Sequence, residues 1–186
     1  MVLFQLLMKR IYSLWFLPEE SINKKYQKII SGIASSYRTQ EFKPHVTLIK
    51  HLELKEKEVL SFTNELIKWL KPTKTKFMEL GYSDRRYRSL YITVLKTQEL
   101  LKAHNKANQI FEHKEEPFMP HLSIVYGELP LDDKLNIIKS LKPLNKEFFT
   151  LDKLVVYDVT EANADLWKEV GYYGFKVVPD NVYWHL

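Results

Sequence analysis

A repeated octapeptide constrains the fold of this chain more than any other feature of its sequence. Residues 42–49 read F-K-P-H-V-T-L-I and residues 118–125 read F-M-P-H-L-S-I-V, so that Phe, Pro and His recur and Thr is matched by Ser. After the proline each copy is short, apolar and β-rich, which is typical of a strand. The same strand in each half of the chain predicts two similar lobes related by a pseudo-two-fold axis.

Hydrophobic periodicity predicts that helices and strands alternate around the two copies. We expect helices over 18–37, 55–70, 98–114 and 132–141, and strands over 11–17, 44–50, 76–82, 88–95, 120–126, 147–160 and 167–178. Because the strands at the end of each half read as hairpins, the predicted class is α+β, with antiparallel or mixed sheets flanked by helices around a central cleft.

The composition excludes several classes of protein. The 186 residues include no cysteine, which excludes disulfide scaffolds, thiolate zinc sites, iron–sulfur clusters and thiol catalysis. The five glycines form no G-x-G-x-x-G or Walker-type run, which argues against dinucleotide enzymes and P-loop NTPases. The formal net charge of +5 suits an anionic ligand or RNA, but it also suits an ordinary lysine-rich surface.

The N-terminal segment is apolar but does not resemble a targeting signal. Lys9 and Arg10 follow the apolar residues, whereas a signal peptide carries its positive charges first. No apolar run approaches the ~18 residues that are needed to cross a bilayer. We therefore expect a cytoplasmic protein without membrane contact, in which an extension (1–10) precedes a single bilobal domain (11–186).

The two motifs also carry the chemistry. Residues i and i+2 of a strand share a face, so His45 lies beside Thr47, and His121 lies beside Ser123. If the lobes meet about a pseudo-two-fold axis, two imidazoles and two hydroxyls converge on one cleft. Imidazoles act as base and acid near neutral pH, and hydroxyls donate to phosphoryl oxygens. This set fits acid–base cleavage of a phosphodiester and requires no metal ion, cofactor or covalent nucleophile.

The paired motifs resemble the two-histidine (2H) phosphoesterase superfamily, which is defined by two H-x-[TS]-x motifs on a bilobal α+β fold. The segments Y-S-L-W-F-L-P-E-E, H-L-S-I-V-Y-G and L-W-K-E-V are similar to the plant- and yeast-type cyclic phosphodiesterases, and this similarity runs from about residue 12 to 178. The resemblance implies hydrolysis of 2′,3′-cyclic nucleotides or of ADP-ribose 1″,2″-cyclic phosphate.

Carried over to this sequence, the resemblance implies that His45 and His121 are the catalytic pair and that Thr47 and Ser123 hold the phosphate. The family pattern favours His121 as the base that activates water and His45 as the acid on the leaving ribose oxygen. The pseudo-symmetry of the two motifs makes either order chemically sensible.

Three aromatic residues are candidates for substrate contacts. Trp15 matches the tryptophan that follows Y-S-[LV] in the family, and the alternative is a plain core residue. Tyr87 falls where the family often has an aromatic that faces the ligand, and the alternative is a tyrosine at a strand edge. Tyr126 matches the tyrosine of H-L-S-x-x-Y, but strict alternation from His121 points it away from the cleft unless the strand twists or ends there.

Other features leave alternatives open. The D-R-R-Y-R run at 84–88 either steers a diphosphate or an RNA backbone, or only solvates a hairpin. The remaining histidines have no partners at metal-like spacing, so no zinc site is expected; they are His51, His104, His113 and His185. The expected partner of this monomer is a small nucleotide cyclic phosphate. The alternatives are an enzyme acting on RNA ends, either 2′-5′ ligase-like or an oligonucleotide phosphodiesterase, and a non-catalytic nucleotide- or RNA-binding module.

Overall fold

The computed structural model describes residues 9–113, 117–141 and 146–175. The strands are β1 (Arg10–Pro18), β2 (Val46–Leu54), β3 (Thr73–Tyr82), β4 (Leu90–Val94), β5 (His121–Val125), β6 (Phe148–Asp158) and β7 (Lys168–Gly174). The helices are α2 (Glu20–Tyr37), α3 (Glu56–Leu66), α4 (Gln98–Ile110) and α5 (Leu131–Leu141). The described residues also form the 3₁₀ turns η1 (Ile67–Trp69), η2 (Arg86–Arg88) and η4 (Ala164–Leu166).

The seven strands form one sheet that closes on itself. The strand order is β1-β2-β5-β4-β3-β6-β7, and an additional β1–β6 pairing joins the two ends of the first six strands. β6 can join both lobes because its first residues pair with β3 while the rest of the strand pairs with β1 and β7. Every ladder between these strands is antiparallel, so the α+β class is confirmed and the sheet is not mixed.

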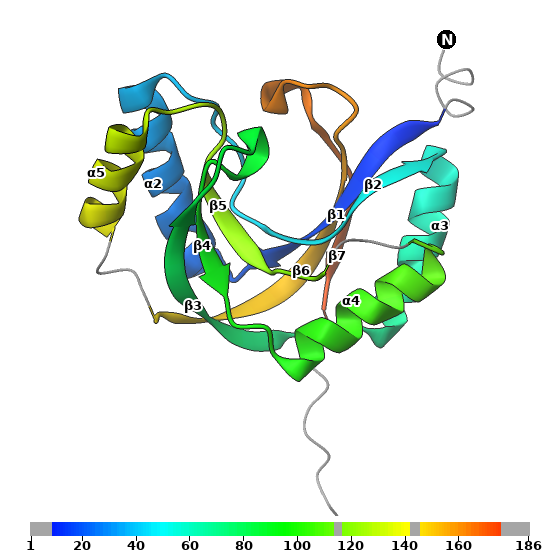
Figure 1. Cartoon of the computed structure of the whole chain (residues 1–186). Coiled ribbons are helices and arrows are strands. Elements are labelled where there is room, and N and C mark those ends of the chain that lie inside the picture. The colour runs from blue at the N-terminus through cyan, green and yellow to red at the C-terminus, as the bar shows by residue number, and fades with distance from the viewer. Residues whose placement is uncertain (1–8, 114–116, 142–145, 176–186) are drawn as a thin grey trace, which may run out of the picture.

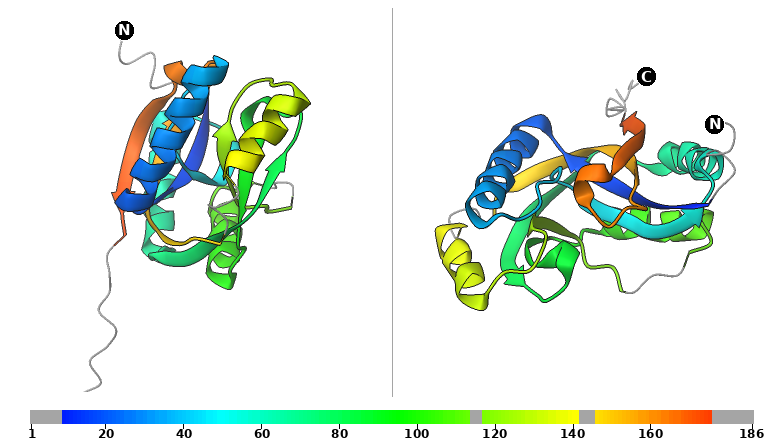
Figure 2. Two further views of the ribbon diagram at one scale, coloured as in Figure 1. Left: turned by 90° about the vertical axis from the view of Figure 1, so that its left-hand side faces the viewer. Right: turned by 90° about the horizontal axis from the view of Figure 1, so that it is seen from above.

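Helices cover the sheet on two sides (Figures 1 and 2). α2 and α5 lie against β5 and β3, and α3 and α4 lie against β2. The buried residues of α2 recur at four-residue spacing, so that they form one stripe of the helix, and they are Ile22, Tyr26, Ile30 and Ala34. α2 precedes the first motif in the chain but packs on β5, the strand of the second motif, so the two halves of the chain are interlocked.

The predicted elements are all present, with shifted ends. β2 begins at Val46 rather than at residue 44, and it continues to Leu54, four residues beyond the prediction. The helix predicted over 55–70 ends as α-helix at Leu66 and continues as η1. Arg10 already belongs to β1, where it pairs with Leu54, while residues 1–8 of the expected extension lie outside the described residues. The same holds for Lys114, for residues 176–178 of the last predicted strand and for His185.

Among the helices that the structure describes, none has both the length and the hydropathy that a membrane span requires.

Replacing Leu122 tests whether the contact between β2 and β5, where Val46 pairs with Leu122, stabilises the whole fold. The side chain is fully buried, and Leu122→Ala leaves a cavity, so we expect the free energy of unfolding to fall by about 2–5 kcal/mol. Leu166→Ala is the control, because Leu166 is 54% exposed and its truncation should cost less than about 0.5 kcal/mol. Urea unfolding measures the free energy of unfolding of both variants. Equal losses in the two variants would contradict the stabilising role given to Leu122.

Candidate active site

The two histidine motifs meet where the lobes join. Val46 of β2 pairs with Leu122 of β5 in an antiparallel register. Continuing this register by one residue in each direction sets His45 opposite Ser123 and Thr47 opposite His121. Since Cβ atoms of directly opposed residues lie about 4.5–5.5 Å apart, each imidazole has a hydroxyl beside it on its own strand and another across the strand pair.

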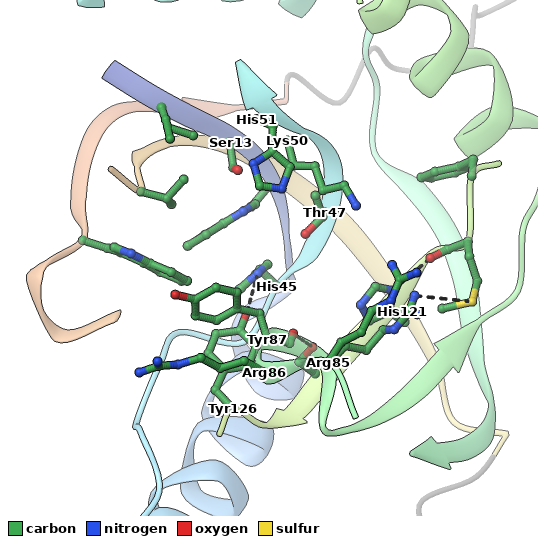
Figure 3. Close-up of a pocket in the computed structure, with 18 of the residues that line it drawn as sticks. Ser13, His45, Thr47, Lys50, His51, Arg85, Arg86, Tyr87, His121 and Tyr126 are labelled. Atoms are coloured by element: carbon green, nitrogen blue, oxygen red, sulfur yellow. Dashed lines mark hydrogen bonds between the residues drawn. The ribbon is translucent and has the colours of Figure 1, made fainter. Parts of the chain in front are cut away.

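These four side chains open into a cleft of about 350 Å³ (Figure 3). Val46 and Leu122 are fully buried, so the alternation of the strands turns the residues on either side of them into the cleft. All seven side chains predicted from the sequence line it, namely Trp15, His45, Thr47, Tyr87, His121, Ser123 and Tyr126. None of the described lining residues is an aspartate or a glutamate.

Local contacts hold His45 in place on two sides. Its Nδ1 lies 2.6 Å from the carbonyl oxygen of Lys43. Its ring stacks on Trp15 at 3.7 Å with an interplanar angle of 10°, and Trp15 in turn stacks on Tyr157 at 4.2 Å. The imidazole is therefore restrained by a hydrogen bond at one edge and by a column of aromatic rings against its face.

His121 repeats the same backbone contact. Its Nδ1 lies 2.9 Å from the carbonyl oxygen of Met119, which is again two residues earlier in the chain. A carbonyl oxygen only accepts, so Nδ1–H is the donor in both His45 and His121, and Nε2 of each neutral ring keeps its lone pair. The two copies of the motif therefore give both histidines the same tautomer, with the proton on Nδ1.

Burial makes both imidazoles resist protonation. The pKa of His45 is lowered to about 3, chiefly by loss of solvent. The hydrogen bond to the Lys43 carbonyl acts to raise this pKa, and the proximity of His121 acts to lower it. Burial also lowers the pKa of His121, and the nearby positive charges of Arg88 and Lys50 act in the same direction. In the free protein both rings are neutral at neutral pH, and an anion between them would raise the pKa of both.

The two hydroxyls differ in their bonding. Ser123 is buried, and its Oγ donates to the carbonyl oxygen of Tyr87 at 3.1 Å. Thr47 is only half-buried and lies on the strand that pairs with Trp15. A bound phosphate therefore competes with a backbone carbonyl for the Ser123 proton.

Tyr126 reaches the cleft because its strand ends before it. β5 stops at Val125, and Tyr126 forms an isolated bridge with Gln40, so strict alternation no longer applies. Its hydroxyl oxygen lies 3.3 Å from Nε2 of His45, whose lone pair accepts the proton, and its ring stacks on Phe42 at 3.6 Å. The sequence allowed Tyr126 to face the cleft only if the strand twists or ends there, and β5 does end before Tyr126.

Trp15 and Tyr87 line the cleft in different ways. Trp15 is 3% exposed, lines the cleft and stacks on His45, so it is a core residue as well as a cleft residue. Tyr87 is 39% exposed and lies in η2 rather than at a strand edge. Its hydroxyl donates to the carbonyl oxygen of Ala162 at 2.6 Å, and its ring lies 5.4 Å from that of Trp167.

Several lining residues were not among the predicted site residues. Trp167 stood in the L-W-K-E-V segment, and Arg88 stood in the D-R-R-Y-R run, so signals existed for both. Lys50 had none, because alternation from Thr47 points Ile49 into the cleft, whereas Ile49 is fully buried. His51 shares the face of Thr47 by alternation, but it lies one residue beyond the end of the predicted strand. As for metals, no group of three or more His, Cys, Asp or Glu side chains among the described residues is arranged to hold an ion.

Comparison with known proteins gives concordant matches. Residues 10–148 match the family model of cyclic phosphodiesterase-like proteins. The chain is 24% identical to the cyclic phosphodiesterase of Arabidopsis thaliana over 169 residues, which cover 87% of this chain and 93% of that protein. Among solved structures, a Thermus thermophilus protein superposes with a TM-score of 0.63 (13% identity; 90% of this chain, 98% of that chain). LigT of E. coli superposes with a TM-score of 0.59 (10% identity; 91% and 99%). At these identities the structures establish the fold.

The burial of His45 predicts an acid-sensitive fold. A pKa lowered from 6.5 to about 3 stabilises the protein above pH 6.5, and this contribution is lost as the pH falls from 6.5 towards 3. Each pH unit in that window costs about 1.4 kcal/mol, so His45→Gln should reduce the loss of stability between pH 6.5 and 5 by about 2 kcal/mol.

Chemical unfolding at several pH values measures this difference. His51→Gln, at an exposed site on the same strand, controls for the loss of a histidine as such. Parallel stability curves for the wild type and His45→Gln would contradict the interpretation.

Proposed function

Because the chain belongs to the cyclic phosphodiesterase-like family of 2H phosphoesterases, we propose that it hydrolyses cyclic phosphodiesters of nucleotides. The substrate class is 2′,3′-cyclic nucleotides or ADP-ribose 1″,2″-cyclic phosphate. One observation carries the proposal: the Val46–Leu122 pairing sets His45 and His121 on the same side of one strand pair, each with Nδ1 engaged and the Nε2 lone pair available. A cyclic phosphate between them meets a base and an acid at once.

The proposed reaction is a displacement by water at phosphorus. His121 Nε2 removes a proton from water, the water oxygen bonds to phosphorus, and the bond from phosphorus to one ribose oxygen breaks. His45, protonated when the anionic phosphate binds, donates its Nε2 proton to that oxygen. The products are a phosphomonoester and a ribose hydroxyl, and the two histidines have exchanged protonation states.

Neighbouring groups support these steps. Thr47 and Ser123 donate hydrogen bonds to the non-bridging oxygens of the phosphate, where negative charge accumulates. Tyr126 donates to His45 Nε2 in the free protein, so it gives up this bond when His45 becomes the acid. Trp15 acts through His45, whose ring it supports. Tyr87 and Trp167 offer aromatic faces to a nucleobase.

The competing proposals are separated by substrate. A non-catalytic binding module would not require two imidazoles with their lone pairs directed into one cleft. An enzyme acting on RNA ends would use the same chemistry on a larger substrate, and the basic residues of the cleft bear on this alternative. Turnover of 2′,3′-cyclic AMP against a short 2′-5′ oligonucleotide distinguishes these functions.

The central test is hydrolysis of 2′,3′-cyclic AMP in the presence of EDTA. We expect full activity in the chelator, because no step of the proposed reaction needs a metal ion. His45→Ala and His121→Ala should each lower kcat by about 10²–10⁴, the range for one general acid or base. The double variant should be little slower than the slower single variant, because the two groups act as a unit.

Steady-state kinetics with thermal melts as the control for folding makes this measurement. Near-wild-type turnover in either single variant would disprove the two-histidine assignment. Loss of activity in EDTA, restored by added Zn²⁺ or Mn²⁺, would disprove the metal-free mechanism.

A further inference from the structure

We propose that the cleft contains a second phosphate-binding subsite beside His121, which takes a phosphoryl group attached to the 5′ oxygen of a nucleoside 2′,3′-cyclic phosphate. The subsite is the basic wall, defined as Lys50 and His51 of β2 together with Arg85 and Arg88 at the η2 turn. The inference rests on the proposed function, because it assumes that the cyclic phosphate lies between the two central histidines.

Two irregularities in β2 create one half of the basic wall. Trp15 pairs with Thr47 but Leu14 pairs with Ile49, so β2 has an extra residue there and both Leu48 and Ile49 are buried. The extra residue reverses the alternation of the strand, so that Lys50 instead of Ile49 lines the cleft with Thr47.

A second irregularity lies further along β2, between Ile49 and Leu52. Leu14 pairs with Ile49 and Tyr12 with Leu52, so three steps along β2 oppose two along β1. At this point His51 has a φ of 56°, in the left-handed region that non-glycine residues seldom adopt. Bulges that redirect side chains, and backbone held in such regions, concentrate at functional sites. Here they bring two consecutive basic residues, Lys50 and His51, to the same cleft.

Arg88 belongs to the other half of the basic wall, and its guanidinium has N–H donors without strong acceptors. Its guanidinium lies over the ring of Tyr91 at 5.4 Å, and Tyr91 in turn contacts His121. Its Nη1 lies 3.9 Å from the sulfur of Met119, which is a weak acceptor. Its Nε is buried and has no hydrogen-bond partner among the described residues. A phosphate is the acceptor that fits an arginine fork, and two N–H groups bind it in parallel.

Positive charge predominates among the described residues that line the cleft. No described residue that lines the cleft is acidic, while all four residues of the basic wall line it, and Figure 3 shows Lys50 and His51 next to Ser13 and Thr47. Arg88 and Lys50 are also the charges that act on the pKa of His121, which shows that both lie within electrostatic range of it. One cyclic phosphate carries one negative charge, so a wall of this size matches a substrate with further negative charge.

The chemistry of the substrate indicates where that charge is attached. A ribose 2′,3′-cyclic phosphate has two other substituents, the base on C1′ and the group on C5′. The aromatic residues Tyr87, Tyr126 and Trp167 lie close to one another, and Tyr126 contacts His45, so they form a separate wall for the base. Arg88 of the basic wall lies over Tyr91, which contacts His121, so this wall is left for the C5′ substituent.

The test compares adenosine 2′,3′-cyclic phosphate with and without a 5′-phosphate. In the wild type we expect the 5′-phosphorylated substrate to have a kcat/KM at least about 10-fold higher, the effect of one hydrogen bond between charged groups. Arg88→Gln and Lys50→Gln should each lower this ratio towards 1, and Arg88→Lys should retain part of it. The ratio is the readout, because it cancels changes in the chemical step that both substrates share.

Arg86→Gln is the matched control. Arg86 belongs to the same turn and carries the same charge, but its guanidinium lies over the Tyr87 ring at 5.9 Å and extends away from His121 in Figure 3. It should keep the wild-type ratio. A wild-type ratio near 1, or a ratio that falls equally in Arg86→Gln and Arg88→Gln, would overturn the subsite.

A binding measurement separates this inference from the proposed function. Calorimetry compares adenosine 2′-monophosphate with adenosine 2′,5′-bisphosphate, and the bisphosphate should bind at least about 10-fold more tightly in the wild type but not in Arg88→Gln. If cyclic substrates are not hydrolysed yet this difference is found, the proposed function fails and the subsite stands. If hydrolysis occurs and the affinities are equal, the subsite fails alone.

One further substrate identifies the source of the phosphate. A diadenylate that ends in a 2′,3′-cyclic phosphate and begins with a 5′-hydroxyl presents a phosphodiester, as an RNA end does, in place of a terminal phosphate. Efficiency equal to that of the 5′-phosphorylated mononucleotide assigns the subsite to RNA ends. Preference for the mononucleotide assigns it to small nucleotides, and efficiency no higher than that of the unphosphorylated nucleoside for both overturns it.

Discussion

The antiparallel contact of Val46 with Leu122 is the constraint on which the site depends. Each of these residues lies between the His and the Thr or Ser of its own motif, and both point into the core. Because a strand alternates, burying them turns both histidines and both hydroxyls to the opposite side at one point of the sheet. A slip of one residue in either strand would bury a histidine and expose a core side chain, so the register that stabilises the fold also assembles the site.

Burial and tautomer together set the chemical state of the histidines. The backbone carbonyls of Lys43 and Met119 hold Nδ1–H of the two rings, and removal from solvent keeps both rings neutral in the free protein. A neutral pair contains two bases and no acid. In the proposed mechanism His45 therefore takes up a proton from solvent when the anionic substrate binds, because the negative charge of the substrate favours the imidazolium ion. The proposed catalysis is thus linked to the charge of the ligand as well as to its shape.

The class of the fold and the four central residues were predictable because they follow from local patterns. The octapeptide repeat identified His45 and His121, and its phenylalanines have matching roles, since Phe42 stacks on Tyr126 and Phe118 stacks on His104. The position of Lys50 was not predictable, because it depends on where β2 gains residues relative to β1, which is a property of the pair of strands. The side on which Tyr126 lies depended likewise on where β5 ends.

The account makes its most direct claim about two imidazoles that act as an acid–base pair on one phosphate. The measurement is the pH dependence of kcat/KM for 2′,3′-cyclic AMP in the wild type and in the His45→Ala and His121→Ala variants. We expect a bell-shaped wild-type profile whose alkaline limb lies below pH 6.5, because the pKa values of both free histidines are lowered. Each variant should lose one limb, and the two variants should lose different limbs. Profiles that keep both limbs in either variant would contradict the claim.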